Sequence, residues 1–233
     1  MNKKHIVYIL FCAAAAASCS RKAFVPEKGD LIFQTAGTSA ASQAIASATA
    51  QHDSIQYDHV GIIEVSGGQI FVIEAAGRRG VVRTPWNEFL SSAPSVGGRP
   101  GVTVKRVVLP EESPRHKGRH RQSAKNSSEK RILAGMVVRR AALFLGQEYD
   151  WYYLPDNGKL YCSELVYEAW LDAAGNHIFE TKPMNFRDSD GNMPQYWTEL
   201  FSRLGEPVPE GIPGTNPNDM SKSPALKEVY RGF

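Results

Sequence analysis

The chain has 233 residues, of which 42% are hydrophobic and 22% are charged, and its formal net charge is +3. This composition is ordinary for a globular protein and excludes disorder of the whole chain. The small net charge and the absence of a nucleic-acid-binding motif argue against a nucleic-acid partner.

The N-terminal residues have the pattern of a bacterial lipoprotein signal. Two lysines precede an apolar run that begins at Ile6 and ends in small residues directly before Cys19. The run is shorter than the roughly 20 residues of a transmembrane helix. We therefore expect residues 1–18 to be a signal peptide, Cys19 to be lipidated, and residues 19–28 to tether an exported protein to a membrane of the bacterial cell envelope. The alternative is an ordinary cleaved signal with a coincidental cysteine.

The first predicted elements of the folded domain are a strand, a helix and a hairpin. Residues 29–34 read as a short strand, and residues 39–50 as a helix rich in serine and alanine. Residues 59–65 and 70–75 are rich in β-branched side chains and flank the sequence Ser-Gly-Gly-Gln. Such runs around a glycine-rich turn predict a β-hairpin.

The elements predicted after the hairpin complete a single domain from residue 29 to residue 233. They are a strand at 102–109, helices at 132–144, from Tyr161 onward and at 194–204, and an irregular tail from about residue 205. A contiguous group of strands with a few helices indicates the α+β class.

Residues 111–131 are rich in basic side chains and contain no large apolar residue before the next predicted helix. We expect a solvated surface insertion, and the alternative is a patch that contacts anionic lipid or cell-wall polymer. His116 and His120 have helical spacing, which in so polar a segment is a weak metal signal. We expect no metal site and no cofactor.

The hairpin register brings a histidine close to a carboxylate. A two-residue turn at Gly67-Gly68 pairs Glu74 with Gly61, so His59 and Glu74 point to the same face, one diagonal step apart. A three-residue turn would place them on opposite faces. Asp58 is a competing carboxylate, but strand alternation sends it to the other face.

Cys162 is the only thiol expected in the mature protein, because Cys12 lies in the signal and Cys19 is predicted to carry lipid. It opens a predicted helix, whose dipole and free N–H groups favour a thiolate. A lone cysteine is more often a small core residue. As a nucleophile it requires an imidazole, which in turn requires an orienting group. His59 and Glu74 are candidates for these two roles.

Aromatic residues precede this cysteine and are candidates for the substrate pocket. Tyr57, Tyr149, Trp151 and Tyr161 are predicted to bind substrate, and for Tyr149 and Trp151 the alternative is hydrophobic packing. The backbone N–H of Cys162 is the simplest oxyanion donor, and the Tyr57 hydroxyl is a candidate second donor.

Six short motifs, taken in order, resemble the permuted papain-like enzymes of the NlpC-type superfamily, specifically the YiiX-like group. In papain-like enzymes the cysteine precedes the histidine, whereas here His59 and Glu74 precede Cys162, as in the permuted branch. The resemblance implies a small antiparallel barrel-like sheet packed against the helix that carries the cysteine, and thiol hydrolase chemistry on an amide or ester. The motifs are GDLIF at 29–33, DHVGI at 58–62, IEA at 73–75, GVV at 80–82, LGQEYD at 145–150 and YCSELV at 161–166.

The expected function is that of a cell-envelope amidase or peptidase. Cys162, His59 and Glu74 would form a triad that cleaves an amide bond of a cell-wall peptide or an N-acyl compound through an acyl-enzyme. One alternative is a lipid ester hydrolase or acyltransferase with the same triad. Another is a non-catalytic lipoprotein that binds a ligand. A wide polar groove would favour a peptide, and a closed apolar pocket would favour a fatty acyl chain.

Overall fold

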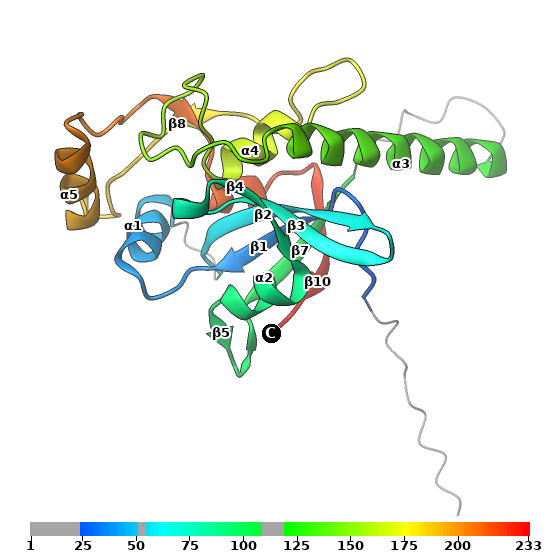
Figure 1. Cartoon of the computed structure of the whole chain (residues 1–233), viewed down its shortest axis with the longest axis horizontal. Coiled ribbons are helices and arrows are strands. Elements are labelled where there is room, and N and C mark those ends of the chain that lie inside the picture. The colour runs from blue at the N-terminus through cyan, green and yellow to red at the C-terminus, as the bar shows by residue number, and fades with distance from the viewer. Residues whose placement is uncertain (1–23, 51–54, 109–118) are drawn as a thin grey trace, which may run out of the picture.

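The computed structural model describes residues 24–50, 55–108 and 119–233, with side chains in the last range from residue 128 onward. Its centre is a six-stranded antiparallel sheet with strand order β10-β7-β1-β2-β3-β4, covered by helices on both faces (Figure 1). This architecture confirms the α+β class, and the barrel-like packing stays a prediction. The strands are β1 (Leu31–Thr35), β2 (Tyr57–Ser66), β3 (Gln69–Ala75), β4 (Val81–Pro85), β7 (Val102–Val107) and β10 (Leu226–Arg231).

Helices α3 (Arg119–Leu143) and α4 (Cys162–Ala169) cover one face of the sheet, and α2 (Trp86–Ser92) covers the other (Figure 1). Helices α1 (Ala40–Thr49) and α5 (Gln195–Leu204) pack together beside one end of the sheet. The smaller elements are the 3-10 turn Gly77–Arg79, α6 (Pro217–Ser221), and the two-stranded pairs β5 (Ser95–Val96) with β6 (Arg99–Pro100) and β8 (Lys182–Pro183) with β9 (Pro213–Gly214).

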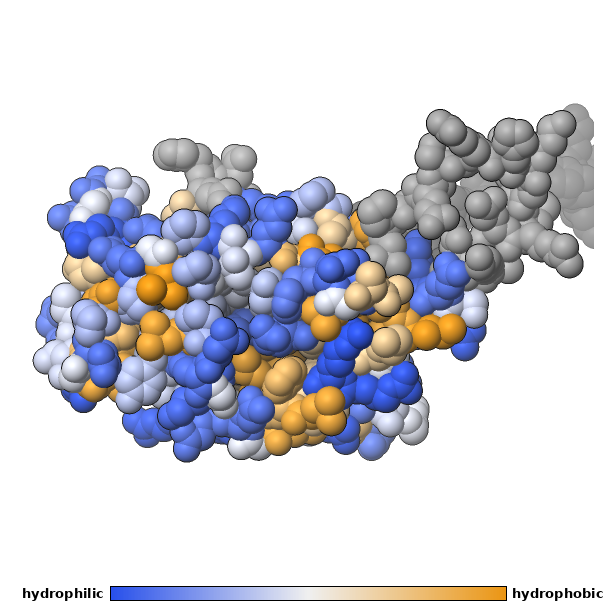
Figure 2. All heavy atoms as spheres, turned by 90° about the horizontal axis from the view of Figure 1, so that it is seen from above, coloured by the Kyte–Doolittle hydropathy of each residue, from blue (hydrophilic) through white to orange (hydrophobic). Residues whose placement is uncertain are grey.

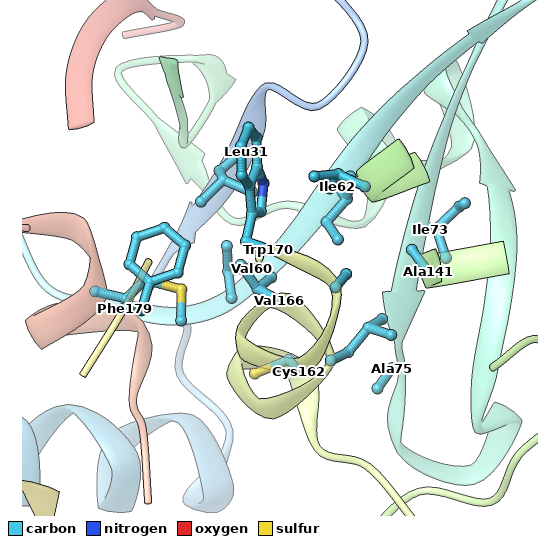
Figure 3. Close-up of a cluster of buried hydrophobic side chains, with 14 of the residues drawn as sticks. Leu31, Val60, Ile62, Ile73, Ala75, Ala141, Cys162, Val166, Trp170 and Phe179 are labelled. Carbon is cyan, nitrogen blue, oxygen red and sulfur yellow. The ribbon is translucent and has the colours of Figure 1, made fainter. Parts of the chain in front are cut away.

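Strand β1 separates two hydrophobic cores. Leu31 and Phe33 belong to the core under α3 and α4, whereas Ile32 packs with Phe89 of α2. Successive strand side chains point to opposite faces. A strand covered on both faces therefore has consecutive apolar residues, here Leu31 to Phe33, and all five residues of β1 are buried, including the polar Gln34 and Thr35. Figure 3 shows the first core, in which Leu31 and Cys162 lie on opposite sides of a shared apolar cluster.

The β2–β3 hairpin has the predicted register. Ile62 pairs with Ile73 and Ser66 with Gln69, which leaves a two-residue turn. Both turn glycines have positive φ, 57° at Gly67 and 77° at Gly68. A type I′ hairpin turn needs this conformation at both central positions, and glycine adopts it without a steric cost.

The sequence predicted an irregular tail from about residue 205, but the structure has regular elements in this segment. It contains α6 and the edge strand β10, which pairs with β7. Its strand is short and only half-buried, with Val229 and Tyr230 packing on the core of α2. An edge strand with so few apolar residues has little periodic signal, which explains the error.

Helix α3 begins at Arg119 and so takes in part of the predicted insertion at 111–131. Its C-terminal half packs on the sheet through Leu133, Val137 and Ala141. Hydrophobic periodicity marks a helix only where one face is buried, so the sequence located that half alone. Residues 109–118, the predicted signal and Cys19 lie outside the described residues.

Candidate active site

Cys162 is the first residue of α4 and is buried, with 5% of its surface exposed. The helix is held in place because Leu165, Val166 and Ala169 all face the core that lies on the sheet. Backbone N–H groups of the first helical turn lack partners within the helix and carry the positive end of its dipole. Figure 3 shows Cys162 on this helix. A negative charge on its sulfur would be stabilised by the N-terminus of the helix.

His59 and Glu74 meet as the hairpin register predicts. The Nε2 atom of His59 on β2 lies 2.5 Å from Oε2 of Glu74 on β3. The Glu74 side chain is 5% exposed and that of His59 is 18% exposed, so the imidazole has its edge at the surface of the site. The predicted sharing of one face by these two residues is confirmed.

The second carboxylate oxygen of Glu74 is held by two further residues that the sequence reasoning missed. Its Oε1 accepts hydrogen bonds from Arg79 Nη2 at 3.0 Å and from Thr84 Oγ1 at 2.5 Å. Burial alone would raise the pKa of Glu74, but His59, Thr84 and Arg79 together lower it. Val82 pairs with Glu74 in the sheet, so strand alternation could have identified Thr84 as a diagonal neighbour.

The imidazole of His59 interacts with the thiol of Cys162 as well as with the carboxylate of Glu74. Burial lowers the pKa of His59, but hydrogen bonding to Cys162 and Glu74 and the charges of both outweigh burial and raise it to about 10. The imidazole is therefore protonated at neutral pH when its partners are ionised. Three residues from β2, β3 and α4 thus form one interacting group.

A cavity of about 60 Å³ opens beside Cys162. It is far smaller than the roughly 300–1,000 Å³ of pockets that enclose drug-sized ligands. Its wall is mostly aromatic and apolar, and its polar groups include Asp58, Asn185 and Asn216. The apolar wall includes Ile45, Tyr149, Tyr153, Tyr161, Met184, Phe186 and Trp197.

Two of the four predicted substrate-binding residues line this cavity, Tyr149 and Tyr161. Trp151 instead packs behind Tyr149, with ring centroids 4.7 Å apart. Tyr57 is buried in the core, where its ring contacts Phe33 and its hydroxyl lies 2.9 Å from Thr103 Oγ1. Tyr57 is not among the residues that line the cavity, because its ring lies in the core and its hydroxyl bonds to Thr103 of β7.

Asp58 does not orient the histidine. Its carboxylate accepts the backbone N–H of Gly37 at 3.3 Å and lines the cavity. Phe186 and Trp197, which the sequence did not indicate, come from the chain after α4 and pack edge-to-face at 5.0 Å. Nothing in their sequence neighbourhood links them to Cys162.

Within the described ranges, no group of three or more His, Cys, Asp and Glu side chains could hold a metal ion. None of the helices described there is both long and apolar enough to cross a membrane.

Comparisons with known proteins agree with this geometry. The family model described as "Permuted papain-like amidase enzyme, YaeF/YiiX, C92 family" matches residues 25–230. The uncharacterized protein YiiX of Escherichia coli K12 is 27% identical over 209 residues, which cover 90% of this chain and 88% of that protein. A crystal structure of YiiX from Escherichia coli O157:H7, whose title calls it a metalloprotein, has a TM-score of 0.62 at 25% identity and covers 88% of this chain and 97% of the other. The chain therefore belongs to the YaeF/YiiX family of permuted papain-like amidases and is a thiol hydrolase.

Proposed function

We propose that this hydrolase cleaves an amide bond with Cys162 as nucleophile, His59 as proton carrier and Glu74 as the group that orients the imidazole. The observation that carries the proposal is the position of His59, which interacts with the thiol and lies 2.5 Å from the buried carboxylate. Because Nε2 faces Glu74, Nδ1 is the nitrogen left for the sulfur.

The proposed reaction has two halves. The Cys162 thiolate attacks the carbonyl carbon, and the C–N bond breaks as the imidazolium of His59 gives its proton to the leaving amine. The product is a thioester on Cys162. Neutral His59 then takes a proton from water, and the resulting hydroxide attacks the thioester. The C–S bond breaks, the acid is released, and the thiolate of Cys162 and the imidazolium of His59 are restored.

The negative oxygen formed during attack needs hydrogen-bond donors. The backbone N–H of Cys162 at the start of α4 is the first donor that we propose. Tyr149 is the second in place of Tyr57, because it lines the cavity beside the sulfur. Burial raises the pKa of Tyr149 well above its usual value, and the nearby charges of Tyr153 and Cys162 add to this, so its hydroxyl keeps its proton.

The cavity limits the group that can lie next to the scissile bond. A small cavity with an aromatic wall suits a short apolar group, such as the side chain of a cell-wall peptide or the first carbons of an acyl chain. A long acyl chain would have to leave the cavity along the protein surface. These dimensions favour amides with a short apolar group over a buried fatty acyl chain.

The cell envelope is the proposed location, supported by the signal pattern before Cys19. Metabolic labelling with an alkyne-bearing fatty acid tests the anchor. Wild-type protein should be labelled and Cys19→Ser should not, and equal labelling of both would contradict it.

The catalytic proposal is tested by incubating the purified chain with N-acyl amino acids and short peptides and measuring amine release. An amidase is supported if amine release disappears in Cys162→Ala. It is also supported if the peptide that contains Cys162 carries an acyl adduct after the wild-type reaction is stopped with acid. Adduct formation from esters alone would favour the ester hydrolase or acyltransferase alternative. Absence of any adduct from both classes would favour the ligand-binding alternative.

A further inference from the structure

A second and larger cavity lies at the other end of α4. It has a volume of about 840 Å³ and lies between residues 128–135 of α3, the segment before β1 and Trp170. Trp170 directly follows the last residue of α4, eight residues after Cys162. At 1.5 Å per helical residue the two ends are about 12 Å apart, so this groove is separate from the hydrolase site.

The walls of the groove are apolar and its rim is basic. Val65, Leu133 and Trp170 contribute apolar surface, and Lys28, Lys130 and Arg131 contribute positive charge. These three cations are exposed, and none forms an ion pair with another residue that the structure describes. The positive charge at the rim is therefore available to a ligand.

The acidic residues of the groove do not cancel this charge. Asp30 and Glu27 are both bound by Arg106, at 2.7 Å from Asp30 Oδ1 and 2.5 Å from Glu27 Oε1. These two carboxylates stand against four cations in the lining, Lys28, Arg106, Lys130 and Arg131, so the described lining keeps a net positive charge, 4 − 2 = +2. A ligand of this groove must be anionic at the rim and apolar inside.

Two more observations point to an unfilled binding site. The indole N–H of Trp170 is buried and has no hydrogen-bond partner among the described residues. At Gly135, which lines the groove, an added Cβ would meet no atom within 4 Å. A buried donor without a partner is costly, and the space beside α3 is open.

Large apolar residues are exposed next to the same rim. Val25 is 70% exposed and Ile132 is 59% exposed. Figure 2 views the α3 side from above and shows hydrophobic and hydrophilic side chains interspersed at the end near the grey segment. Exposed apolar side chains among lysine and arginine are typical of surfaces that contact anionic membranes.

We propose that this groove binds an anionic phospholipid, with the phosphate at Lys130 and Arg131 and the beginning of an acyl chain along Leu133 and Trp170. Pro26, in its wall, is only seven residues after Cys19, the predicted anchor. A lipid held here would fix how the domain lies on the bilayer. The binding site does not depend on the triad.

The test is calorimetric titration of the purified full chain in a non-ionic detergent with dihexanoylphosphatidylglycerol, dihexanoylphosphatidylcholine and glycerol phosphate. Dihexanoylphosphatidylglycerol should bind at least about tenfold more tightly than the other two ligands. Lys130→Ala/Arg131→Ala should weaken its binding by about tenfold or more, since the phosphate would lose both of the charge-assisted contacts that we propose for it. Arg78→Ala/Arg139→Ala removes two exposed cations outside the groove and should leave binding unchanged.

Gly135→Leu separates binding from folding. Leucine favours the helix relative to glycine and would fill the open space, so this variant should melt no lower than wild type and lose lipid binding. Equal affinity for phosphatidylcholine would overturn the proposal, as would tight binding of glycerol phosphate alone. Unchanged binding by both groove variants would also overturn it.

Discussion

The imidazole of His59 and the carboxylate of Glu74 lie 2.5 Å apart on neighbouring strands, and both side chains are largely buried. The two residues interact because a two-residue turn fixes the register of the hairpin that carries them. Arg79 and Thr84 then hold the far oxygen of the carboxylate. The orienting half of the proposed triad is thus built into the sheet.

Replacement of Glu74 by glutamine should lower the reactivity of Cys162. The neutral amide removes the charge that helps to keep His59 protonated, so fewer molecules carry an imidazolium beside the Cys162 sulfur at pH 7. The rate of alkylation by iodoacetamide should fall by about tenfold or more, since one pKa unit is a factor of ten.

Glu64→Gln is the matched control for this variant. Glu64 is also buried on the hairpin, but it pairs with Arg83 at 2.8 Å, outside the triad. Its variant should be alkylated at the wild-type rate. A similar decrease in both variants would mean that the effect comes from general loss of stability.

Much of this site could be predicted from sequence, because the length of a hairpin turn determines which residues of its two strands share a face of the sheet. His59 and Glu74 were found in that way. Strand β10 and the aromatic wall could not be found so easily, because they depend on long-range packing. Trp197, for example, lies on α5, whose local sequence gives no sign of the site. Its ring centroid is nevertheless 5.5 Å from that of Tyr153.

Tyr149→Phe should reduce catalysis and leave the thiol reactive. Loss of one oxyanion donor typically costs about 10²–10³ in kcat. The phenyl ring keeps the cavity wall, so KM and the alkylation rate of Cys162 should change little. Steady-state kinetics with any amide that wild type cleaves would measure this. A variant with wild-type kcat would exclude Tyr149 as an oxyanion donor.

Glu164 should make the fold less stable as pH rises. Burial raises its pKa from 4.5 to about 8, and the charge of nearby Asp150 adds to this, whereas the Tyr161 backbone N–H opposes it. The folded state therefore binds a proton that the unfolded state releases between these pH values, and stability falls as pH rises from 4.5 to about 8.

Glu164→Gln should remove that loss. Thermal melting at pH 5 and at pH 8 should show the variant gaining on the order of a few kcal/mol relative to wild type between the two conditions. Glu180→Gln, an exposed position after α4, is the control and should respond to pH as wild type does. A parallel response of wild type and Glu164→Gln to pH would rule out a neutral Glu164.

The central claim is that His59 carries a proton at neutral pH because it lies between Cys162 and Glu74. ¹⁵N NMR of the histidine rings, followed from pH 6 to pH 11, tests this most directly. The account predicts that both His59 nitrogens are protonated at pH 8 and that the ring titrates near pH 10. It also predicts titration at lower pH in Glu74→Gln and in Cys162→Ala. A wild-type His59 that is neutral at pH 8 and titrates near its ordinary pKa of about 6.5 would contradict the account.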